Sequence, residues 1–279
     1  MADPFDNKVI ALTGAGSGIG RALALNLAGR GAVLALADKD SEGLAETRRL
    51  LGNRPASLTV LDVTDTDALT AWVDGAVAEF GRLDGIINNA GLSVVAPFAD
   101  TPRADFDRVM SVNFGGVVEG CRAALPHLKM QAAATGTAWL VNISSVFGMM
   151  GYPTQSAYNA SKYAVRGLTE ALHIELGVTD PGICVIRVHP GGVRTNVAIN
   201  SKRIAGMPGQ RTDLDFAAEF EKAAKTTPEQ AAAIIINGMA RRRHRVLIGN
   251  DAKFIDWMTR LFPVTYFKRI GAFIGGGDR

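Results

Sequence analysis

The sequence predicts an α/β fold in which helices cover both faces of a doubly wound parallel sheet. Two patterns carry this prediction. Short apolar runs alternate with longer helix-like segments along most of the 279 residues, and these runs are hydrophobic at nearly every position rather than at every second one. Strands of that kind are buried on both faces. Strands that alternate with helices pair in parallel through right-handed crossovers.

The predicted elements follow one another with short connections. Strands are expected at residues 8–12, 33–37, 57–61, 85–87, 138–143, 183–188 and 246–248, and helices near 19–29, 42–51, 65–80, 103–130, 156–177 and 228–242. No internal repeat or low-complexity linker interrupts the series. We therefore expect one domain over residues 1–250, and a C-terminal extension over 251–279 that is not an independent domain.

Two segments depart from the alternation. Residues 196–227 are polar and contain Gly and Pro, which predicts a long loop that is either a lid or a disordered excursion. The segment 254–273 carries six aromatic residues: Phe254, Trp257, Phe262, Tyr266, Phe267 and Phe273. Two interpretations of this segment stay open. It packs on its own core or on a neighbouring subunit, or it forms an amphipathic contact with a membrane surface or a lipid, helped by Arg260, Lys268 and Arg269.

The composition excludes several classes of protein. Hydrophobic residues make up 47% and charged residues 20%, which is typical of a globular chain, and a net charge of +3 gives no support to nucleic-acid binding. Cys121 and Cys184 lie far apart and the histidines are scattered, so neither a disulfide scaffold nor a metal site is expected. No signal peptide and no membrane-spanning run are recognised, and a cytoplasmic location is the default expectation.

A glycine-rich string follows the first predicted strand and leads into the first helix. Residues 13–20 read Thr-Gly-Ala-Gly-Ser-Gly-Ile-Gly. Glycines at such a turn allow a pyrophosphate to approach backbone N–H groups at the positive end of a helix. The spacing differs from G-x-G-x-x-G, and no Gly-Lys-Ser/Thr follows as a P-loop requires. The candidate contacts are Gly14, Ser17, Gly18, Ile19 and Gly20.

Asp38 ends the second predicted strand. A carboxylate at this position accepts hydrogen bonds from the ribose hydroxyls of an adenosine and repels a 2′-phosphate, which favours NAD over NADP as the cofactor. The neighbouring Lys39 complicates this interpretation, because a cation there tolerates the phosphate. The alternative is that Asp38 only caps the helix that follows.

Tyr158 and Lys162 lie four residues apart in Tyr-Asn-Ala-Ser-Lys, so on a helix they share one face. An ammonium group close to a phenol favours the phenolate, and we expect it to lower a pKa that is otherwise ~10. Such a tyrosine can exchange a proton with a substrate oxygen near neutral pH. Taken alone, the pair also fits an ordinary surface contact.

Polar residues follow several other predicted strands. Ser144 and Ser145 come after the strand at 138–143, residues 88–91 (Asn-Asn-Ala-Gly) end the strand before it, and residues 190–195 (Pro-Gly-Gly-Val-Arg-Thr) follow a third. Ligands of open parallel sheets bind at the carboxyl ends of the strands. These groups are therefore expected to converge on one edge of the sheet.

Together these motifs resemble the short-chain dehydrogenases/reductases, in the single-domain branch. The matching residues are the string at 13–20, Asp62 and Val63, residues 88–91, Asn113, Ser145, Tyr158 with Lys162, and residues 190–195, in family order across 8–248. The resemblance implies a seven-stranded Rossmann-type sheet in the order 3-2-1-4-5-6-7. It also implies hydride transfer to or from a nicotinamide ring.

The family roles transfer to these positions. The resemblance implies that Tyr158 is the general acid/base, that Lys162 lowers its pKa and binds the nicotinamide ribose, and that Ser145 holds the substrate oxygen. Asn113 would position a water that links Lys162 to solvent. The other implied cofactor contacts are Asp62, Val63, Asn89, Ala90, Gly91, Pro190, Gly191, Val193 and Thr195.

The predicted walls of the substrate pocket are apolar. They comprise Val94, Val95, Phe98, Val146, Phe147, Met149, Met150 and Tyr152. Pockets rich in Met and aromatic side chains suit bulky apolar molecules. We therefore expect a bulky hydrophobic secondary alcohol or ketone as substrate, although the same residues could simply fill the core.

Several alternatives remain at this stage. The chain could be an NADPH-dependent carbonyl reductase of broad range, or a non-catalytic cofactor-sensing protein on the same fold. Epimerases and dehydratases that use the same Tyr/Lys pair usually carry a further substrate domain, for which this chain has no room. The resemblance also implies a homodimer or homotetramer, built on the helices at 103–130 and 156–177.

Overall fold

The computed structural model describes residues 3–194, 202–203 and 224–268. Its main sheet has seven strands in the order β3-β2-β1-β4-β6-β7-β9, and every neighbouring pair is parallel. The strands are β1 (Val9–Thr13), β2 (Val33–Asp38), β3 (Ala56–Val60), β4 (Gly85–Asn88), β6 (Ala138–Ile143), β7 (Ile183–Pro190) and β9 (Arg245–Ile248). The predicted sheet and its strand order are confirmed.

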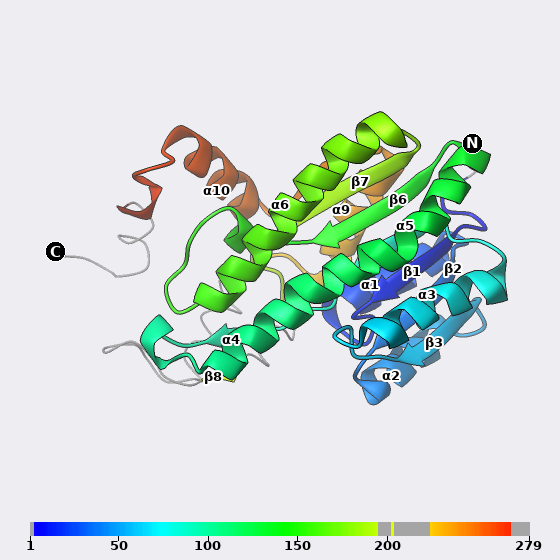
Figure 1. Ribbon diagram of the computed structural model, residues 1–279, viewed down its shortest axis with the longest axis horizontal. Coiled ribbons are helices and arrows are strands. Elements are labelled where there is room, and N and C mark those ends of the chain that lie inside the picture. The colour runs from blue at the N-terminus through cyan, green and yellow to red at the C-terminus, as the bar shows by residue number, and fades with distance from the viewer. Residues whose placement is uncertain (1–2, 195–201, 204–223, 269–279) are drawn as a thin grey trace.

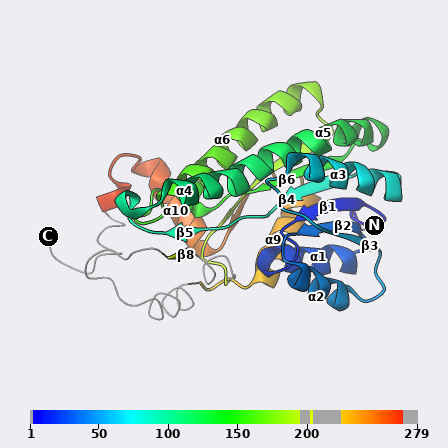
Figure 2. The ribbon, with the colours of Figure 1, turned by 60° about the horizontal axis from the view of Figure 1, so that its bottom comes forward.

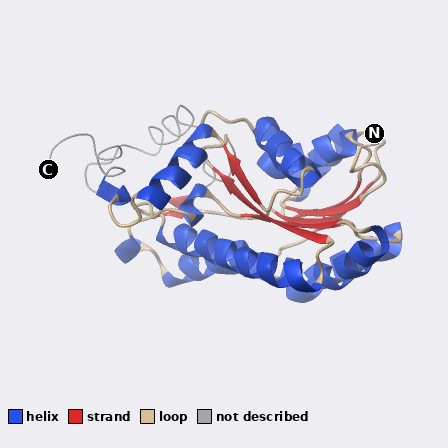
Figure 3. Cartoon of the chain, turned by 90° about the horizontal axis from the view of Figure 1, so that it is seen from above, coloured by secondary structure: helices blue, strands red, loops and turns tan. Residues whose placement is uncertain are grey.

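Helices lie on both faces of this sheet, as Figure 3 shows. They are α1 (Gly18–Gly29), α2 (Ser41–Leu51), α3 (Thr66–Phe80), α4 (Arg103–Met110), α5 (Gly116–Thr135), α6 (Ser156–Thr179), α9 (Pro228–Ala240) and α10 (Asn250–Leu261). One hydrophobic core forms between the sheet and α1, α2 and α9, and a second forms on the other face under α3, α5 and α6. The uninterrupted burial of β1 and β6 reflects these two layers.

The predicted helix at 103–130 is wrong in one respect, because the structure divides it. A π-helical turn, Ser111–Gly115, separates α4 from α5, and α5 continues past the predicted end to Thr135. The turn contains Asn113, whose amide group bonds to the backbone of Leu92. A π turn inserts one residue into a helix and so redirects a side chain, which occurs frequently at functional sites.

A buried polar chain joins helix α6 to the middle of the sheet. Asn88 in β4 donates to Asn142 in β6 at 2.8 Å, and Asn142 donates to the Thr169 hydroxyl in α6 at 3.0 Å. The three side chains are at most 2% exposed. Buried amides of this kind must be paired, so the chain fixes how α6 lies over the strands.

The two departures from the alternation have different outcomes. Most of 196–227 lies outside the described residues, although β8 (Lys202–Arg203) pairs with β5 (Val94–Val95) apart from the main sheet (Figure 2). The C-terminal extension begins with α10, which lies at one end of the molecule in Figure 1. This helix buries Ala252 and Met258 and leaves Phe254 and Trp257 about half exposed. Within the described residues, none of the helices has the length and apolar character needed to cross a bilayer.

Candidate active site

The polar residues singled out in the sequence come together at the carboxyl edge of the sheet. The glycine string leaves β1, Asp38 ends β2, Asn89 follows β4 and Ser145 follows β6. Because all seven strands of the main sheet are parallel, these ends share one edge. The tyrosine and the lysine enter from the first two turns of α6, whose N-terminus lies near the same edge.

The glycine string makes a turn that larger residues would block. Gly14 has a φ of +68°, a conformation that side chains rarely adopt. A Cβ at Gly20 would overlap the carbonyl oxygen of Gly14 and would lie 2.7 Å from Nδ2 of Asn89. The Asn89 amide in turn donates to the carbonyl oxygens of Thr13 and Gly14 at 3.1 Å. The string is therefore packed tightly against the end of β4.

The turn leaves backbone donors for an anion. Ser17 is the N-cap of α1, yet its side chain forms no capping hydrogen bond, so the first N–H groups of the helix keep their capacity to bind a pyrophosphate. Asp38 accepts from the Gly16 N–H at 2.8 Å and from the Asp40 N–H at 3.0 Å. Each carboxylate oxygen retains a lone pair for a ribose hydroxyl. These residues fit a dinucleotide.

Lys39, the cation next to Asp38, has acidic residues close to it. Lys39 lies between Asp38 and Asp40 in the chain, and its charge contributes to the lowered pKa of Asp62. The main cause of that lowered pKa is a hydrogen bond from the Thr64 N–H. Val63, the next predicted contact, is buried.

The turn after β7 is held by a residue of the C-terminal extension. Gly192 donates its N–H to the Asp251 carboxylate at 2.6 Å, and Val193 forms a β-bridge with Thr226. Pro190 and Gly191 lie at the end of β7, where Gly191 donates to the carbonyl oxygen of Ile248. Thr195 lies outside the described residues.

Tyr158, Ser145 and Lys162 form one cluster. The Ser145 side chain is hydrogen-bonded to the Tyr158 phenol, and Nζ of Lys162 lies 5.6 Å from the centre of the phenol ring. Lys162 is only 4% exposed, and it donates to the carbonyl oxygen of Ile143 at 3.0 Å. Tyr158 has an intermediate exposure.

Burial dominates the ionisation of this cluster. It raises the pKa of Tyr158 to about 12, although the hydrogen bond with Ser145 opposes the shift. The direction of this shift is opposite to the lowering expected from Lys162. Burial also lowers the pKa of Lys162 to about 8. At neutral pH the phenol is thus a proton donor beside an ammonium group.

Asn113 reaches the cluster from the π turn. Its Nδ2 donates to the Ser161 hydroxyl at 3.0 Å, which ties the turn to α6. A Cβ at Gly91 would lie 3.2 Å from Oδ1 of Asn113 and 3.5 Å from Nζ of Lys162, so all three residues meet at one point. Ala90 directly precedes this point and donates its N–H to the Thr13 hydroxyl at 3.2 Å.

Sequence reasoning missed three residues that support the site. Asn159 fixes the loop after β6, His189 lies behind Ser145, and Arg21 joins the glycine string to α2. His189 is fully buried, and its Nδ1 bonds the Ser145 carbonyl oxygen at 2.9 Å. Its Nε2 has no hydrogen-bond partner among the residues that the structure describes. Only Asn159 carried a signal, because it adjoins Tyr158 in the sequence.

The predicted pocket walls divide into two groups. Phe147 stacks on Tyr152 with ring centres 4.9 Å apart, and it meets Tyr158 edge-on at 6.1 Å. Val146 and Met149 instead pack with Ala252 beneath α10, so they fill the core. The remaining predicted wall residues also differ in exposure: Val94, Val95 and Met150 are buried, whereas Phe98 is 74% exposed.

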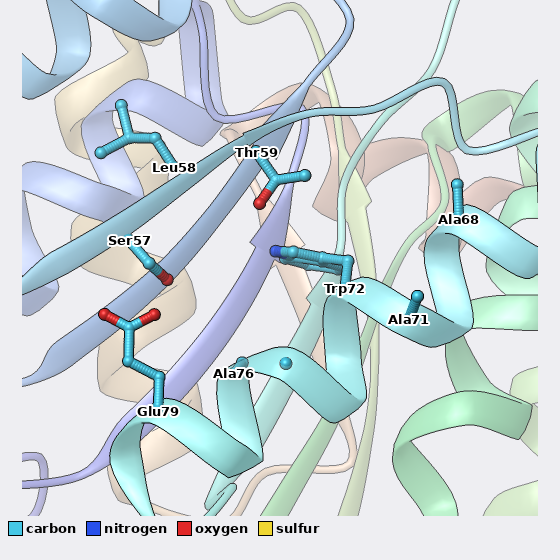
Figure 4. A pocket seen from close by; sticks show the side chains of 9 residues that line it. Ser57, Leu58, Thr59, Ala68, Ala71, Trp72, Ala76 and Glu79 are labelled. Carbon is cyan, nitrogen blue, oxygen red and sulfur yellow. The ribbon is translucent and has the colours of Figure 1, made fainter.

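A separate pocket lies at the β3 edge of the sheet. It has a volume of about 470 Å³ and opens between β3 and α3, with Ser57, Thr59, Trp72 and Glu79 in its lining (Figure 4). None of the predicted catalytic or cofactor residues lines it. This pocket is therefore distinct from the cluster around Tyr158.

Comparisons with known proteins agree with this geometry. The family model for short chain dehydrogenases matches residues 8–204. SadH of Mycobacterium tuberculosis, described as an oxidoreductase, is 44% identical over 271 residues, which cover 96% of this chain and 95% of that protein. Levodione reductase of Leifsonia aquatica is 38% identical over 204 residues, covering 71% and 74%.

A solved structure has the same arrangement. A short chain dehydrogenase/reductase from Burkholderia phymatum in complex with NAD aligns with a TM-score of 0.83 and 29% identity, covering 94% of this chain and 96% of that one. This chain is therefore an oxidoreductase of the short-chain dehydrogenase/reductase family, whose members act on CH–OH groups.

Proposed function

We propose that the protein transfers a hydride between NAD and a bulky hydrophobic secondary alcohol or ketone, with Tyr158 as the general acid/base. The observation that carries this proposal is the cluster in which a protonated Tyr158 is hydrogen-bonded to Ser145 beside the buried Lys162. A bound nicotinamide cofactor supplies or accepts the hydride.

The chain's own residues perform the proton chemistry. In reduction, the Tyr158 phenol donates its proton to the substrate oxygen, and the Ser145 hydroxyl holds that oxygen in place. The Lys162 ammonium stabilises the phenolate that remains. Asn113, next to Lys162 at Gly91, positions a water through which the proton is replaced. In oxidation the same groups act in reverse.

The carboxylates near the end of β2 favour NAD over NADP. Asp38 sits at the end of β2 with lone pairs open to ribose hydroxyls, and Asp40 and Asp62 offset the charge of Lys39. A 2′-phosphate would meet these carboxylates. The solved Burkholderia phymatum relative is in complex with NAD, which supports the proposal. The second candidate function is an NADPH-dependent carbonyl reductase, which Lys39 would favour.

The substrate class is inferred from the rings beside Tyr158. Phe147 and Tyr152 form an aromatic surface there. Such a surface binds large apolar molecules by removing them from water, and gains little from small polar ketones. Levodione reductase, a relative by sequence, is a reductase by name.

The first test is fluorescence titration of the purified protein with NADH and, separately, NADPH. We expect tighter binding of NADH, followed by NADH-dependent reduction of bicyclic or aryl ketones. Tighter binding of NADPH would move the assignment to the second candidate. Binding of neither cofactor would contradict the oxidoreductase function itself.

Replacement of Tyr158 by Phe removes the proton donor and keeps the ring. We expect kcat for ketone reduction to fall by roughly 10²- to 10⁴-fold, the usual contribution of a general acid. The Kd for NADH serves as the control and should change little. A variant that keeps more than a tenth of the activity would contradict the role of Tyr158.

We also propose that the protein is a homodimer or homotetramer. Figures 1 and 2 show α5 and α6 alongside each other, and an apolar groove between them is lined by Val118, Cys121, Leu125, Leu168 and Leu172 among others. A second copy that packs on these helices would cover the groove. Light scattering on the eluting protein measures the mass directly, and a monomer would contradict this assembly.

A further inference from the structure

The loop between β6 and α6 is held from inside by one side chain. Asn159 donates from Nδ2 to the carbonyl oxygens of Phe147 and Met150, at 2.8 and 2.7 Å. Its Oδ1 accepts the Tyr152 N–H at 3.1 Å. Asn159 is 9% exposed, so it satisfies three backbone groups of the loop away from water. Each end of the segment 147–152 is thereby tied to the helix that carries Tyr158.

The same loop is held from outside by the C-terminal extension. The Gly151 N–H donates to the Tyr266 hydroxyl at 3.1 Å. Tyr266 also shares a side-chain hydrogen bond with Tyr163 of α6. The pKa of Tyr163 is raised mainly by burial, and its interactions with Tyr266 add to the shift. The Tyr266 hydroxyl therefore connects the loop with the catalytic helix. A phenylalanine at 266 could form neither bond.

The held loop carries the aromatic surface next to the catalytic tyrosine. Phe147 begins the segment and Tyr152 ends it, and their rings stack at 4.9 Å. The Phe147 ring also touches Tyr158 edge-on. A shift of the loop would move both rings relative to Tyr158, and with them the surface that faces a bulky substrate.

We propose that Tyr266 is a specificity-determining positioning residue, which acts through Gly151 to hold the aromatic loop 147–152 against the catalytic tyrosine. This inference rests on the proposed function, because it concerns how that active site selects large substrates. The C-terminal extension is thus part of the specificity machinery, and Tyr266 acts through its contacts with Gly151 and Tyr163. Asn159 holds the same loop from the opposite side.

The expected effect follows from the chemistry of the bond. Tyr266→Phe removes two hydrogen bonds, of which only the one from Gly151 holds the loop. Loss of one such bond changes an equilibrium by roughly three- to tenfold. Gly151 is exposed, so water can replace the lost partner and the protein remains folded. The loop then samples positions in which its rings no longer lie flat against a large substrate. A small ketone, which does not reach these rings, is unaffected.

The test compares Tyr266→Phe with the wild-type protein, using NADH-dependent reduction of cyclohexanone and of 2-decalone. Gly151→Ala is the matched control, because it retains the N–H, and its Cβ would lie 3.8 Å from the Tyr266 hydroxyl, an ordinary contact. Asn159→Asp is a second variant, which keeps an acceptor for Tyr152 but removes the two donors. Hydrogen exchange of the loop amides is measured on all four proteins without substrate.

We expect faster amide exchange at residues 151–152 in Tyr266→Phe. The KM for 2-decalone should rise about three- to tenfold while kcat, the KM for cyclohexanone and the Kd for NADH stay unchanged. Gly151→Ala should match the wild type, and Asn159→Asp should show a larger change of the same kind. Unchanged loop exchange in Tyr266→Phe would overturn the proposal, as would an equal change in KM for both ketones.

A different result would contradict the proposed function. A wild-type protein that binds no NADH and reduces neither ketone would contradict the oxidoreductase assignment. The exchange measurement would still decide whether Tyr266 holds the loop. The two inferences therefore fail in separate experiments.

Discussion

Tyr158 and Lys162 show how burial sets the chemistry of individual residues. Removal from water opposes charge on both groups, so it raises the pKa of the phenol and lowers that of the ammonium. The site thus holds a neutral acid beside a lysine whose pKa, about 8, lies close to physiological pH. The pair suits proton donation to a ketone near neutral pH.

The pH dependence of the reaction follows from Lys162. The ammonium is present below about pH 8 and is lost above it. We expect kcat/KM for ketone reduction to be level at neutral pH and to fall roughly tenfold per pH unit well above this pKa. Lys162→Arg, which stays charged, should lack the decline even if its activity is lower. A wild-type profile that stays level to pH 10 would contradict this role.

We expect His189 to make the free energy of unfolding depend on pH. Burial lowers its pKa from 6.5 to about 4, so the folded protein keeps it neutral while the unfolded chain protonates it below 6.5. The neutral, buried His189 therefore contributes fully to the free energy of unfolding above pH 6.5. This contribution is lost as the pH falls towards 4, which lowers the free energy of unfolding by about 3 kcal/mol. Urea unfolding at pH 7 and pH 4.5 should show a smaller loss for His189→Gln than for the wild type. Equal losses would exclude His189 as the cause.

At the scale of elements, function depends on where regular structure is interrupted. The π turn between α4 and α5 directs Asn113 towards α6, and the glycine string forms a tight turn between β1 and the first residues of α1. The turn is tight because neither Gly14 nor Gly20 has a side chain, which leaves room for the Asn89 amide and for the carbonyl oxygen of Gly14. Small backbone changes at this turn should therefore affect cofactor binding before they affect the fold.

Gly20→Ala tests the turn. Its Cβ would overlap the Gly14 carbonyl oxygen, so the string must open, and we expect the Kd for NADH to rise on the order of tenfold or more. Gly29→Ala, at the other end of the same helix, is the control because no atom lies within 4 Å of its Cβ. That variant should bind NADH normally and gain about 0.5–1 kcal/mol of stability from helix propensity. Equal NADH binding by both variants would contradict the packing argument.

For the molecule as a whole, the C-terminal extension links parts of the site that are far apart in the chain. Its Asp251 holds the turn after β7, its Ala252 packs under the loop after β6, and its Tyr266 bonds to that loop. The extension therefore touches both the predicted cofactor side and the predicted substrate side of the active site. The two contacts should be separable by mutation.

Asp251→Ala tests the cofactor side. Without the carboxylate, the Gly192 N–H loses its partner and the turn loosens, so we expect the Kd for NADH to rise roughly three- to tenfold. Asn250→Ala, an exposed neighbour, is the control. Calorimetry with NADH measures both variants. An unchanged Kd in Asp251→Ala would show that the extension does not support the cofactor turn.

Local spacing explains what the sequence could reveal. The succession of strands and helices along the chain, the glycine string and the Tyr158–Lys162 pair depend on residues that are close together in the chain, and the covered sheet follows from its apolar runs. The order of the strands within the sheet was implied by the family resemblance. These features, and the edge at which they meet, were predictable from the residues and from the family that they resemble. The boundaries of most elements differ from the prediction by only a few residues.

Tertiary structure decided which residues from remote segments come into contact and how deeply each of them is buried. His189 behind Ser145, Asp251 under Gly192 and Tyr266 against Gly151 join residues 44, 59 and 115 positions apart, and no local pattern marks such pairs. The sequence also could not predict whether the pKa of Tyr158 is raised or lowered, because desolvation depends on which atoms surround the phenol. The sequence determined the chemistry of the site, whereas the three-dimensional packing set its ionisation and the position of its walls.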